Sequence, residues 1–357
     1  MKAAKITAQI KVVKTWILRT TSYKMREPST VNVAKILISA TVVALVAIVS
    51  FGQTQSSSTT APGKTILDAG VKPPATFAIK VNEVDLSFTA RDRHNRWVTD
   101  LAETDISVLD NGQPPSSILK FQSHADLPLR VGLIVDTSDS VSRQLGFEEN
   151  SAALFIKQVL NPATDFAFVV GFSSGATLMQ GFTSDTAALG TAIRKLPLGG
   201  STALYDAVYY ACGKLQERGD GQIVRRVLIL MTDGEDNSSH VRAREAIEAA
   251  LQANVVIIAL NTNSDPNSSD PKYREFKEMA ETSGGMILKA DSEKQVAKAF
   301  KEIQEQLRSH YLLAYKPAEF NPDGSYRKIR LKVKRHGLHI FYRHGYYAPA
   351  TDVKIEK

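Results

Sequence analysis

Cysteine is almost absent from this sequence, and its scarcity excludes several kinds of protein. The 357 residues include one cysteine, Cys212. A single cysteine cannot form an intramolecular disulfide, a CxxC redox centre or a zinc site built from several thiolates. No cysteine follows the apolar run near the N-terminus, which excludes a lipoprotein anchor at that place. The folded part of the chain must therefore be stable without disulfides.

An excess of charge is also missing once the first residues are set aside. The chain carries 44 Lys and Arg residues against 37 Asp and Glu residues, a net charge of +7. Residues 1–35 hold eight basic residues and one acidic residue, so the remainder of the chain is neutral. A neutral folded part has no electrostatic reason to bind a phosphate backbone. We therefore expect no nucleic-acid partner.

A long membrane-spanning run is missing as well. Residues 36–51 are sixteen residues without a charge, and as a helix they would measure about 24 Å, less than the ~30 Å hydrocarbon core of a bilayer. A basic stretch, a short apolar run and the small residues Ser50 and Gly52 are typical of a secretory signal peptide. We expect residues 1–52 to be a signal peptide or, as the alternative, an uncleaved anchor that provides the chain's only membrane contact. Either reading predicts export, to the periplasm, to the medium, or as an extracytoplasmic domain on the anchor.

Two segments with β character flank the centre of the chain. Residues 53–74 are rich in Ser, Thr, Gly and Pro and read as a linker. Alternation over 75–126 predicts a small β-sandwich-like module, in which Asp110-Asn-Gly turns a strand back onto residues 118–121. Residues 311–357 predict a short β extension whose basic residues alternate with apolar ones, as on a solvated strand face.

Between residues 127 and 310, apolar strands alternate with amphipathic helices. The runs at 130–135, 224–231 and 255–260 are apolar on both faces. Strands buried on both faces and separated by helices predict an α/β domain with a doubly wound, mainly parallel sheet of the Rossmann-like class. Residues 177–182 follow the strand at 165–171 so closely that we expect an antiparallel hairpin at one edge of the sheet.

Oxygen-bearing side chains stand at three places in this α/β domain. Asp136, Ser138 and Ser140 follow the first buried strand, Thr202 precedes a predicted helix, and Asp233 follows the strand VLILM. Ligands of open α/β sheets bind beyond the carboxyl ends of the strands, so we expect these residues to converge there. All five are hard oxygen donors, which suit Mg²⁺ or Ca²⁺ and not zinc or copper. An ion held largely by hydroxyls and water keeps a place for a carboxylate from a partner.

This set resembles the metal-ion-dependent adhesion site of von Willebrand factor type A (VWA) domains. The DxSxS loop matches Asp136, Ser138 and Ser140, and the distant threonine and aspartate match Thr202 and Asp233. The resemblance implies that the three hydroxyls coordinate the ion directly and that the aspartates act directly or through water. It implies Mg²⁺ as the cofactor, with Mn²⁺ or Ca²⁺ as alternatives, and a protein partner that presents an Asp or Glu carboxylate.

The sequence differs from the family pattern at one position, and its similarity to known proteins extends beyond the site. The family commonly has glycine between the two serines, where this sequence has Asp139, which either changes the loop or adds negative charge. The wider layout is similar to the bacterial VWFA-related family described mainly from acidobacteria. The similar stretch is VTDLAETDISVLDNGQPPSSILKF followed by LPLRVGLIVDTSDSV.

Three other readings compete with a metal-dependent adhesion module. Asp-rich loops at strand ends often serve only as turns and caps, and an envelope scaffold could bind partners without metal. A serine hydrolase is the third reading, because Gly171-Phe-Ser173-Ser-Gly175 matches GxSxG and is followed in order by Asp233 and His310. The segment after Gly175 has β character, whereas a nucleophile elbow must lead into a helix. We therefore expect no enzyme.

Overall fold

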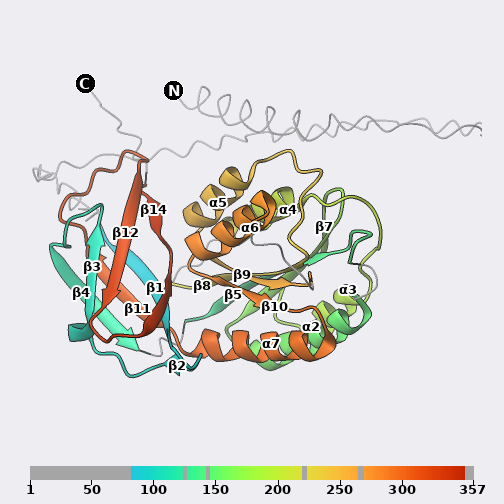
Figure 1. Cartoon of the computed structure of the whole chain (residues 1–357), viewed down its shortest axis with the longest axis horizontal. Helices are drawn as coiled ribbons and strands as arrows, with labels where there is room; N and C mark the ends of the chain where they lie inside the picture. Colours follow the sequence, from blue (N-terminus) through green and yellow to red (C-terminus); the bar gives the residue numbers. More distant parts are fainter. Residues whose placement is uncertain (1–81, 124–126, 142–144, 219–222, 264–268, 350–357) are drawn as a thin grey trace, which may run out of the picture. The chain divides into compact units, whose positions relative to one another are not determined.

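The computed structural model describes residues 82–349, except for 124–126, 142–144, 219–222 and 264–268 (Figure 1). The predicted leader and linker, residues 1–52 and 53–74, lie outside the described residues, as do the outer ends of both β segments. Within the described part, no helix is both long enough and apolar enough to cross a membrane.

A six-stranded sheet forms the centre of the α/β domain, in the order β10-β9-β8-β5-β6-β7. Its strands are β5 (Leu129–Asp136), β6 (Phe166–Phe172), β7 (Ala176–Thr183), β8 (Arg225–Thr232), β9 (Val255–Asn261) and β10 (Met286–Lys289). All neighbours are parallel except β7, which pairs antiparallel with β6 at one edge. The predicted doubly wound sheet and its edge hairpin are therefore confirmed.

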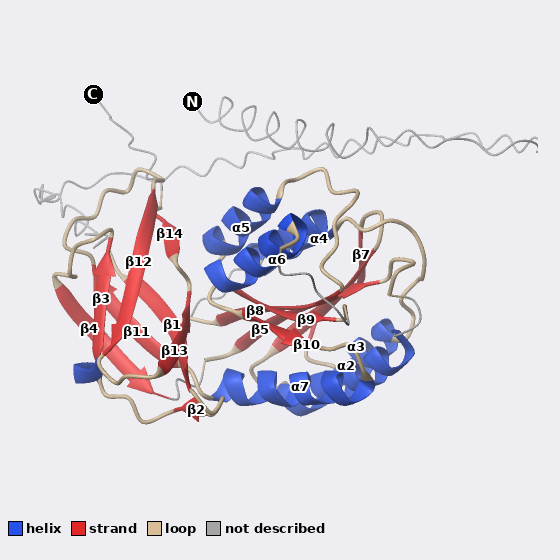
Figure 2. Ribbon diagram, in the orientation of Figure 1, coloured by secondary structure: helices blue, strands red, loops and turns tan. Residues whose placement is uncertain are grey.

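Helices cover both faces of this sheet (Figure 2). One layer consists of α2 (Leu145–Val159), α3 (Thr186–Ile193) and α7 (Glu293–Arg308), and the other of α4 (Leu204–Glu217), α5 (Ala243–Gln252) and α6 (Pro271–Thr282). Every residue of β5 is buried, which explains why its sequence lacks the alternation of a half-exposed strand. Cys212 lies within the α4 layer with 0 % exposure, and burial raises the pKa of its thiol to about 12. It therefore packs as a small apolar residue.

The two flanking β segments fold together as one sandwich. One sheet has the order β13-β1-β11-β4 with β2 also paired to β1, and the other has the order β14-β12-β3. The elements are β1 (Val84–Asp92), β2 (Trp97–Val98), a 3-10 helix (Glu103–Asp105), β3 (Ile106–Asp110), β4 (Ser117–Ser123), β11 (Tyr311–Lys316), β12 (Tyr326–Val333), β13 (Leu338–Tyr342) and β14 (Gly345–Tyr347). Side chains from both sheets share one apolar core. Segments about 200 residues apart in sequence thus complete each other's core.

One sequence-based expectation about the sandwich is wrong. Residues 118–121 do not return along the strand that ends at Asp110: β3 pairs with β12, whereas β4 pairs with β11 in the other sheet. The turn itself is present, since Asp110 bridges to Gln113 and Asn111 and Gly112 have positive φ. The turn therefore leads the chain from one sheet to the other instead of closing a hairpin.

A buried polar network fixes the two sheets to each other. Asp110 is 1 % exposed, and its carboxylate accepts hydrogen bonds from Arg327 Nε at 2.8 Å, Tyr315 Oη at 2.9 Å and Tyr346 Oη at 2.8 Å. Arg327 is 7 % exposed, so the ion pair is nearly dry. Burial together with the adjacent negative charge raises the pKa of Tyr315 and of Tyr346. Each buried polar group of Asp110 is thereby satisfied.

Candidate metal centre

The predicted site residues stand at the carboxyl edge of the central sheet. β5 and β8 are adjacent and parallel, with Val135 opposite Met231. The two strands therefore end at the same level, and the loops that begin at Asp136 and Asp233 lie side by side. Ligand sites of open α/β sheets occupy this position.

Short hydrogen bonds link four of the five predicted residues into one cluster. The hydroxyls of Ser138 and Ser140 are 3.1 Å apart, and Ser140 Oγ donates to Asp233 Oδ2 at 2.7 Å. Asp136 Oδ1 accepts from the backbone N–H of Ser138 at 2.9 Å, which orients the carboxylate into the loop. The structure therefore brings Asp136, Ser138, Ser140 and Asp233 together.

The fifth residue, Thr202, reaches the cluster on a separate loop. Gly199 N–H donates to Thr137 O at 2.8 Å, and Asp139 N–H donates to Gly200 O at 3.3 Å, so the two loops are joined through their backbones. Gly199 and Gly200 have φ of 111° and 105°, values that residues with a Cβ rarely adopt. Among the described residues, no hydrogen bond joins the Thr202 hydroxyl to the other four side chains. Thr202 is adjacent to the cluster but is not bonded into it.

The cluster holds two carboxylates, and none of the described cationic side chains balances their negative charge. Asp136 is 1 % exposed, and burial, followed in smaller part by the charge of Asp233, raises its pKa to about 6. In the described part of the chain, neither aspartate forms an ion pair with a lysine or arginine. A buried carboxylate without a counter-charge is costly, so a cation beside Asp136 would stabilise its charged form.

The spacing of the oxygens fits a small divalent ion. Mg²⁺ holds octahedral ligands at 2.0–2.1 Å, which places neighbouring ligand oxygens about 2.9 Å apart. The Ser138–Ser140 and Ser140–Asp233 separations of 3.1 and 2.7 Å bracket that value. The set contains no nitrogen or sulfur donor, and all of its donors are the hard oxygens that Mg²⁺ prefers. The residues present therefore fit the ion.

Asp139 stands where the family commonly has glycine, and it adopts a backbone conformation that any residue can adopt. Its φ is not positive, so this position does not require glycine. Its side chain is exposed, and a Cβ added at Gly199 would lie 3.5 Å from Asp139 Oδ1. Asp139 therefore points a carboxylate along the neighbouring Gly199 loop and does not distort its own loop.

Three supporting residues were not predicted from the sequence. Thr232 Oγ1 donates to Asp136 Oδ2 at 2.7 Å, and Asn237 Oδ1 accepts from Thr202 N at 2.8 Å. Asp236 Oδ1 accepts from Leu204 N at 2.9 Å and so caps the start of α4. Thr232 lies one residue before Asp233 and Asp236 lies three residues after it, and that proximity was the available signal. Their roles depend on the register between β5 and β8, which periodicity does not give.

The GxSxG motif lies in a turn between two antiparallel strands. Ser173 follows β6, and β7 begins at Ala176, so no helix follows the serine. His310 is 3 % exposed and lies beside Leu307, whose carbonyl also accepts from Arg225 at the amino end of β8. Asp233 follows the other end of that strand, roughly 23 Å away for eight residues. The three residues do not form a hydrolase triad.

A match to one protein-family model agrees with the α/β domain. The family model described as von Willebrand factor type A domain matches residues 131–306. Among solved structures, a von Willebrand factor type A protein from Catenulispora acidiphila is 13% identical over 76% of this chain and 74% of that chain, with a TM-score of 0.44. BatB from Bacteroides thetaiotaomicron is 20% identical over 51% of this chain and 100% of that chain, with a TM-score of 0.38.

A minor pilin, PilB from Streptococcus sanguinis, is 16% identical over 55% of this chain and 63% of that chain, with a TM-score of 0.41. The comparison with curated proteins gives no match. The family match begins inside β5 and ends inside α7, so it covers the central sheet and all three loops of the candidate site.

Proposed function

Because residues 131–306 of this chain are a von Willebrand factor type A domain, we propose that the protein binds a partner protein through a divalent metal ion. Domains of this family generally bind other proteins. The proposed cofactor is Mg²⁺, with Mn²⁺ or Ca²⁺ as alternatives, and the proposed partner group is an Asp or Glu carboxylate. The protein is proposed to act without catalysis.

One observation carries this proposal. Two carboxylates, Asp136 and Asp233, meet two serine hydroxyls at one edge of the sheet, and no described cationic side chain balances them. A cation would balance the charge of both aspartates and take the hydroxyls as ligands. The spacing of the oxygens and the absence of softer donors support Mg²⁺ over zinc or copper.

Each residue of the set has a distinct role in the proposed site. Ser138, Ser140 and Thr202 would supply neutral hydroxyl oxygens, and Asp136 and Asp233 would supply charge, directly or through water. When bound, the ion supplies a Lewis-acidic position for an anionic oxygen. With only two formal negative charges from the chain, the ion would remain attractive to a third carboxylate, the one from the partner.

Export of the protein is a second part of the proposal, and it rests on the sequence of residues 1–52. A basic segment followed by sixteen uncharged residues predicts translocation. The domain would then meet its partner in the periplasm, in the medium, or at the outer face of the membrane that holds an uncleaved anchor.

A thermal-shift measurement tests the metal site. Mg²⁺ at 100 times its Kd should stabilise the fold by about 2.7 kcal/mol, which raises the Tm of a domain this size by roughly 5–10 °C. Asp136→Ala should remove this increase, because it deletes the buried carboxylate. Asp100→Asn, at an exposed position in the sandwich, is the control and should keep the full increase. An equal Mg²⁺ response in Asp136→Ala would overturn the proposal.

A further inference from the structure

Strand β10 has one free edge in the described part of the chain. It lies at the end of the six-stranded sheet and pairs there with β9 alone. Ala290 N–H donates to Asn261 O, and residues of a parallel strand alternate between bonding to a neighbour and facing away from it. Met286 and Leu288 therefore bond toward β9, and the N–H and C=O groups of Ile287 and Lys289 face the free edge.

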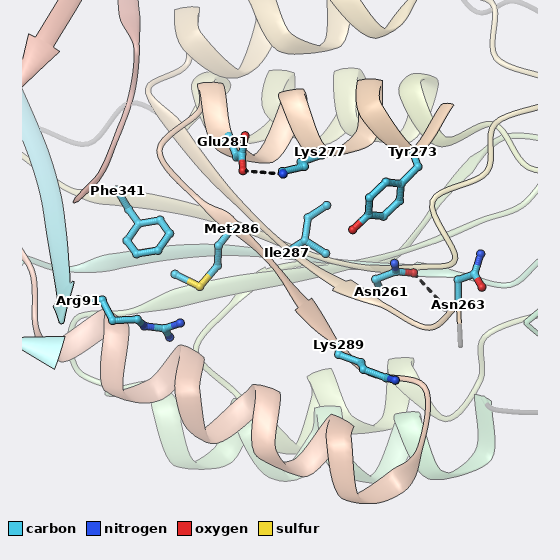
Figure 3. Close-up of a pocket in the computed structure, with 10 residues that line it drawn as sticks. All are labelled: Arg91, Asn261, Asn263, Tyr273, Lys277, Glu281, Met286, Ile287, Lys289 and Phe341. Carbon is cyan, nitrogen blue, oxygen red and sulfur yellow. Dashed lines mark hydrogen bonds and ion pairs between the residues drawn. The ribbon is translucent and has the colours of Figure 1, made fainter. Parts of the chain in front are cut away.

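A groove of 360 Å³ follows this edge (Figure 3). Helix α6 forms one wall with Tyr273, Lys277 and Glu281, which are spaced four residues apart and so lie on one face of the helix. Phe341 of β13 and Arg91 of β1 also line the groove, at the end nearest the sandwich. A groove between an edge strand and a helix is the arrangement that accepts an added peptide strand.

The two sides of the groove offer different surfaces to such a strand. Ile287 and Tyr273 both pack against the core layer on the α6 side. Met286 belongs to the core layer on the α7 side, together with Phe341. Successive side chains of an extended peptide point to opposite faces, so one set would meet α6 and the next set would meet Met286 and Phe341.

Charge distinguishes the two sides further. The lining includes three cations, Arg91, Lys277 and Lys289, and one acid, Glu281. Lys277 is about half exposed and lies 3.7 Å from Glu281, a separation at which an exposed pair contributes little. Arg91 and Lys289 pair with Glu302 and Asp291, which are not part of the lining. The lining as a whole thus has three cations against one acid, an excess that favours an acidic side chain over a basic one, whereas Met286 and Phe341 favour an apolar one.

We propose that the free edge of β10 binds an extended peptide segment of a partner protein, in which acidic and apolar residues alternate. The backbone of the segment bonds to Ile287 and Lys289, its acidic side chains face Lys277, and its apolar side chains contact Met286 and Phe341. This binding uses no metal and is separate from the cluster around Asp136.

Fluorescence anisotropy with short capped peptides tests the proposal on the chain from residue 53 onward. The probe is Thr-Glu-Val-Glu-Val-Glu-Thr, and its matched control replaces each Glu with Lys. EDTA is present throughout, so the metal site does not contribute. The acidic peptide should bind, the basic control should bind at least about tenfold more weakly, and a backbone N-methylated acidic peptide should lose its affinity.

Variants at Ile287 separate backbone recognition from side-chain packing. Ile287→Pro removes an N–H that faces the free edge, which an edge strand tolerates because no ladder bond is lost. It should weaken binding about tenfold, whereas Ile287→Val, which keeps the N–H, should bind like the parent chain. Lys277→Glu should reverse the preference toward the basic peptide. Circular dichroism melts confirm that each variant is folded.

Three results would overturn the proposal. One is the absence of saturable binding of the acidic peptide to the parent chain. Another is equal affinity of Ile287→Pro and Ile287→Val. The third is binding that appears only when Mg²⁺ replaces EDTA, which would assign the peptide to the metal site instead. Loss of peptide binding would leave the Mg²⁺-dependent rise in Tm unaffected, so the two proposals fail independently.

Discussion

Two buried aspartates in this chain are balanced in different ways. Asp110 and Asp136 are each 1 % exposed. Asp110 has Arg327 as its counter-charge and two tyrosine hydroxyls as further donors. Asp136 accepts hydrogen bonds from Thr232 and Ser138, forms no ion pair with a lysine or arginine among the described residues, and has Asp233 nearby, and burial raises its pKa to about 6. Asp110 therefore has its counter-charge within the protein, whereas Asp136 has none among the described residues, and under the proposed function a bound cation would supply it.

Replacing Asp110 tests the first half of this contrast. Asp110→Asn keeps the shape of the side chain but leaves the guanidinium of Arg327 buried without a counter-charge, and we expect a loss of about 3 kcal/mol in the free energy of unfolding. Urea unfolding, followed by the fluorescence of Trp97 in the sandwich, measures this loss. Asp100→Asn breaks the exposed pair with Arg335 and should cost less than ~1 kcal/mol. Equal effects of the two substitutions would show that the buried Asp110–Arg327 pair contributes no more to stability than the exposed Asp100–Arg335 pair.

Sequence reasoning correctly predicted that Asp136, Ser138, Ser140 and Asp233 come together at the edge of the sheet, but it missed the side chains that support their loops. Asp136 and Asp233 could be predicted because each follows a buried apolar run, and two such strands end at one edge of a parallel sheet. Thr232 and Asn237 could not, because their contacts depend on strand register and on the path of a loop. Asp110 was read only as a turn residue, since its partner Arg327 lies 217 residues away.

At the scale of elements, the loop from Gly199 to Thr202 positions Thr202, the fifth residue of the proposed metal site. Its two glycines adopt positive φ, and a Cβ at Gly200 would lie 2.9 Å from Ser174 Oγ. This conformation lets the loop reach the backbone of residues 137–139 and present Thr202. The geometry of the proposed metal site therefore depends on a loop that only glycine fits without strain.

Two Gly→Ala substitutions test the importance of that loop. Gly200→Ala should displace Thr202 and reduce the Mg²⁺-dependent rise in Tm by at least half. Gly213→Ala is the matched control, because it lies within α4 and its added Cβ would meet no atom within 4 Å. The control should raise stability by about 0.5–1 kcal/mol and keep the full Mg²⁺ response. A full response in Gly200→Ala would show that the loop is not part of the site.

The individual strands and turns were easier to predict than the pairing of the strands. The β pattern of residues 75–126 correctly indicated the strand that ends at Asp110, and Asp110-Asn-Gly correctly indicated a turn. The wrong step was to pair that strand with the next one, because local turn chemistry does not decide pairing. The shared core decides it: β3 and β12 place Val108, Ile329 and Leu331 against the opposite sheet.

At the scale of the whole molecule, the VWA domain is inserted in a β-sandwich built from both flanking segments. β1 is a central strand of its sheet, between β11 and β13. α7 ends at Arg308 and β11 begins at Tyr311, so the last helix of the VWA domain leads almost directly into the middle of the sandwich. Arg91 of β1 also pairs with Glu302 of α7. The sandwich cannot be complete without the chain on both sides of the domain.

Ending the chain after His310 tests this arrangement. The truncation removes β11–β14, and β1 then keeps only the two-residue β2 as a neighbour. Hydrogen exchange should show that β1–β4 lose their protection, while β5, β8 and β9 of the VWA domain keep theirs. Unchanged protection of β1–β4 would show that the first β segment folds without the second.

The most direct test of the central claim is a count of Mn²⁺ ions bound, made from the electron paramagnetic resonance signal of the free ion. We expect one saturable site per chain in the parent protein, competed by Mg²⁺, and none in Asp136→Ala. The Gly213→Ala control should retain the site. Absence of a site in the parent chain, or the same site in Asp136→Ala, would contradict the metal-dependent function proposed for this protein.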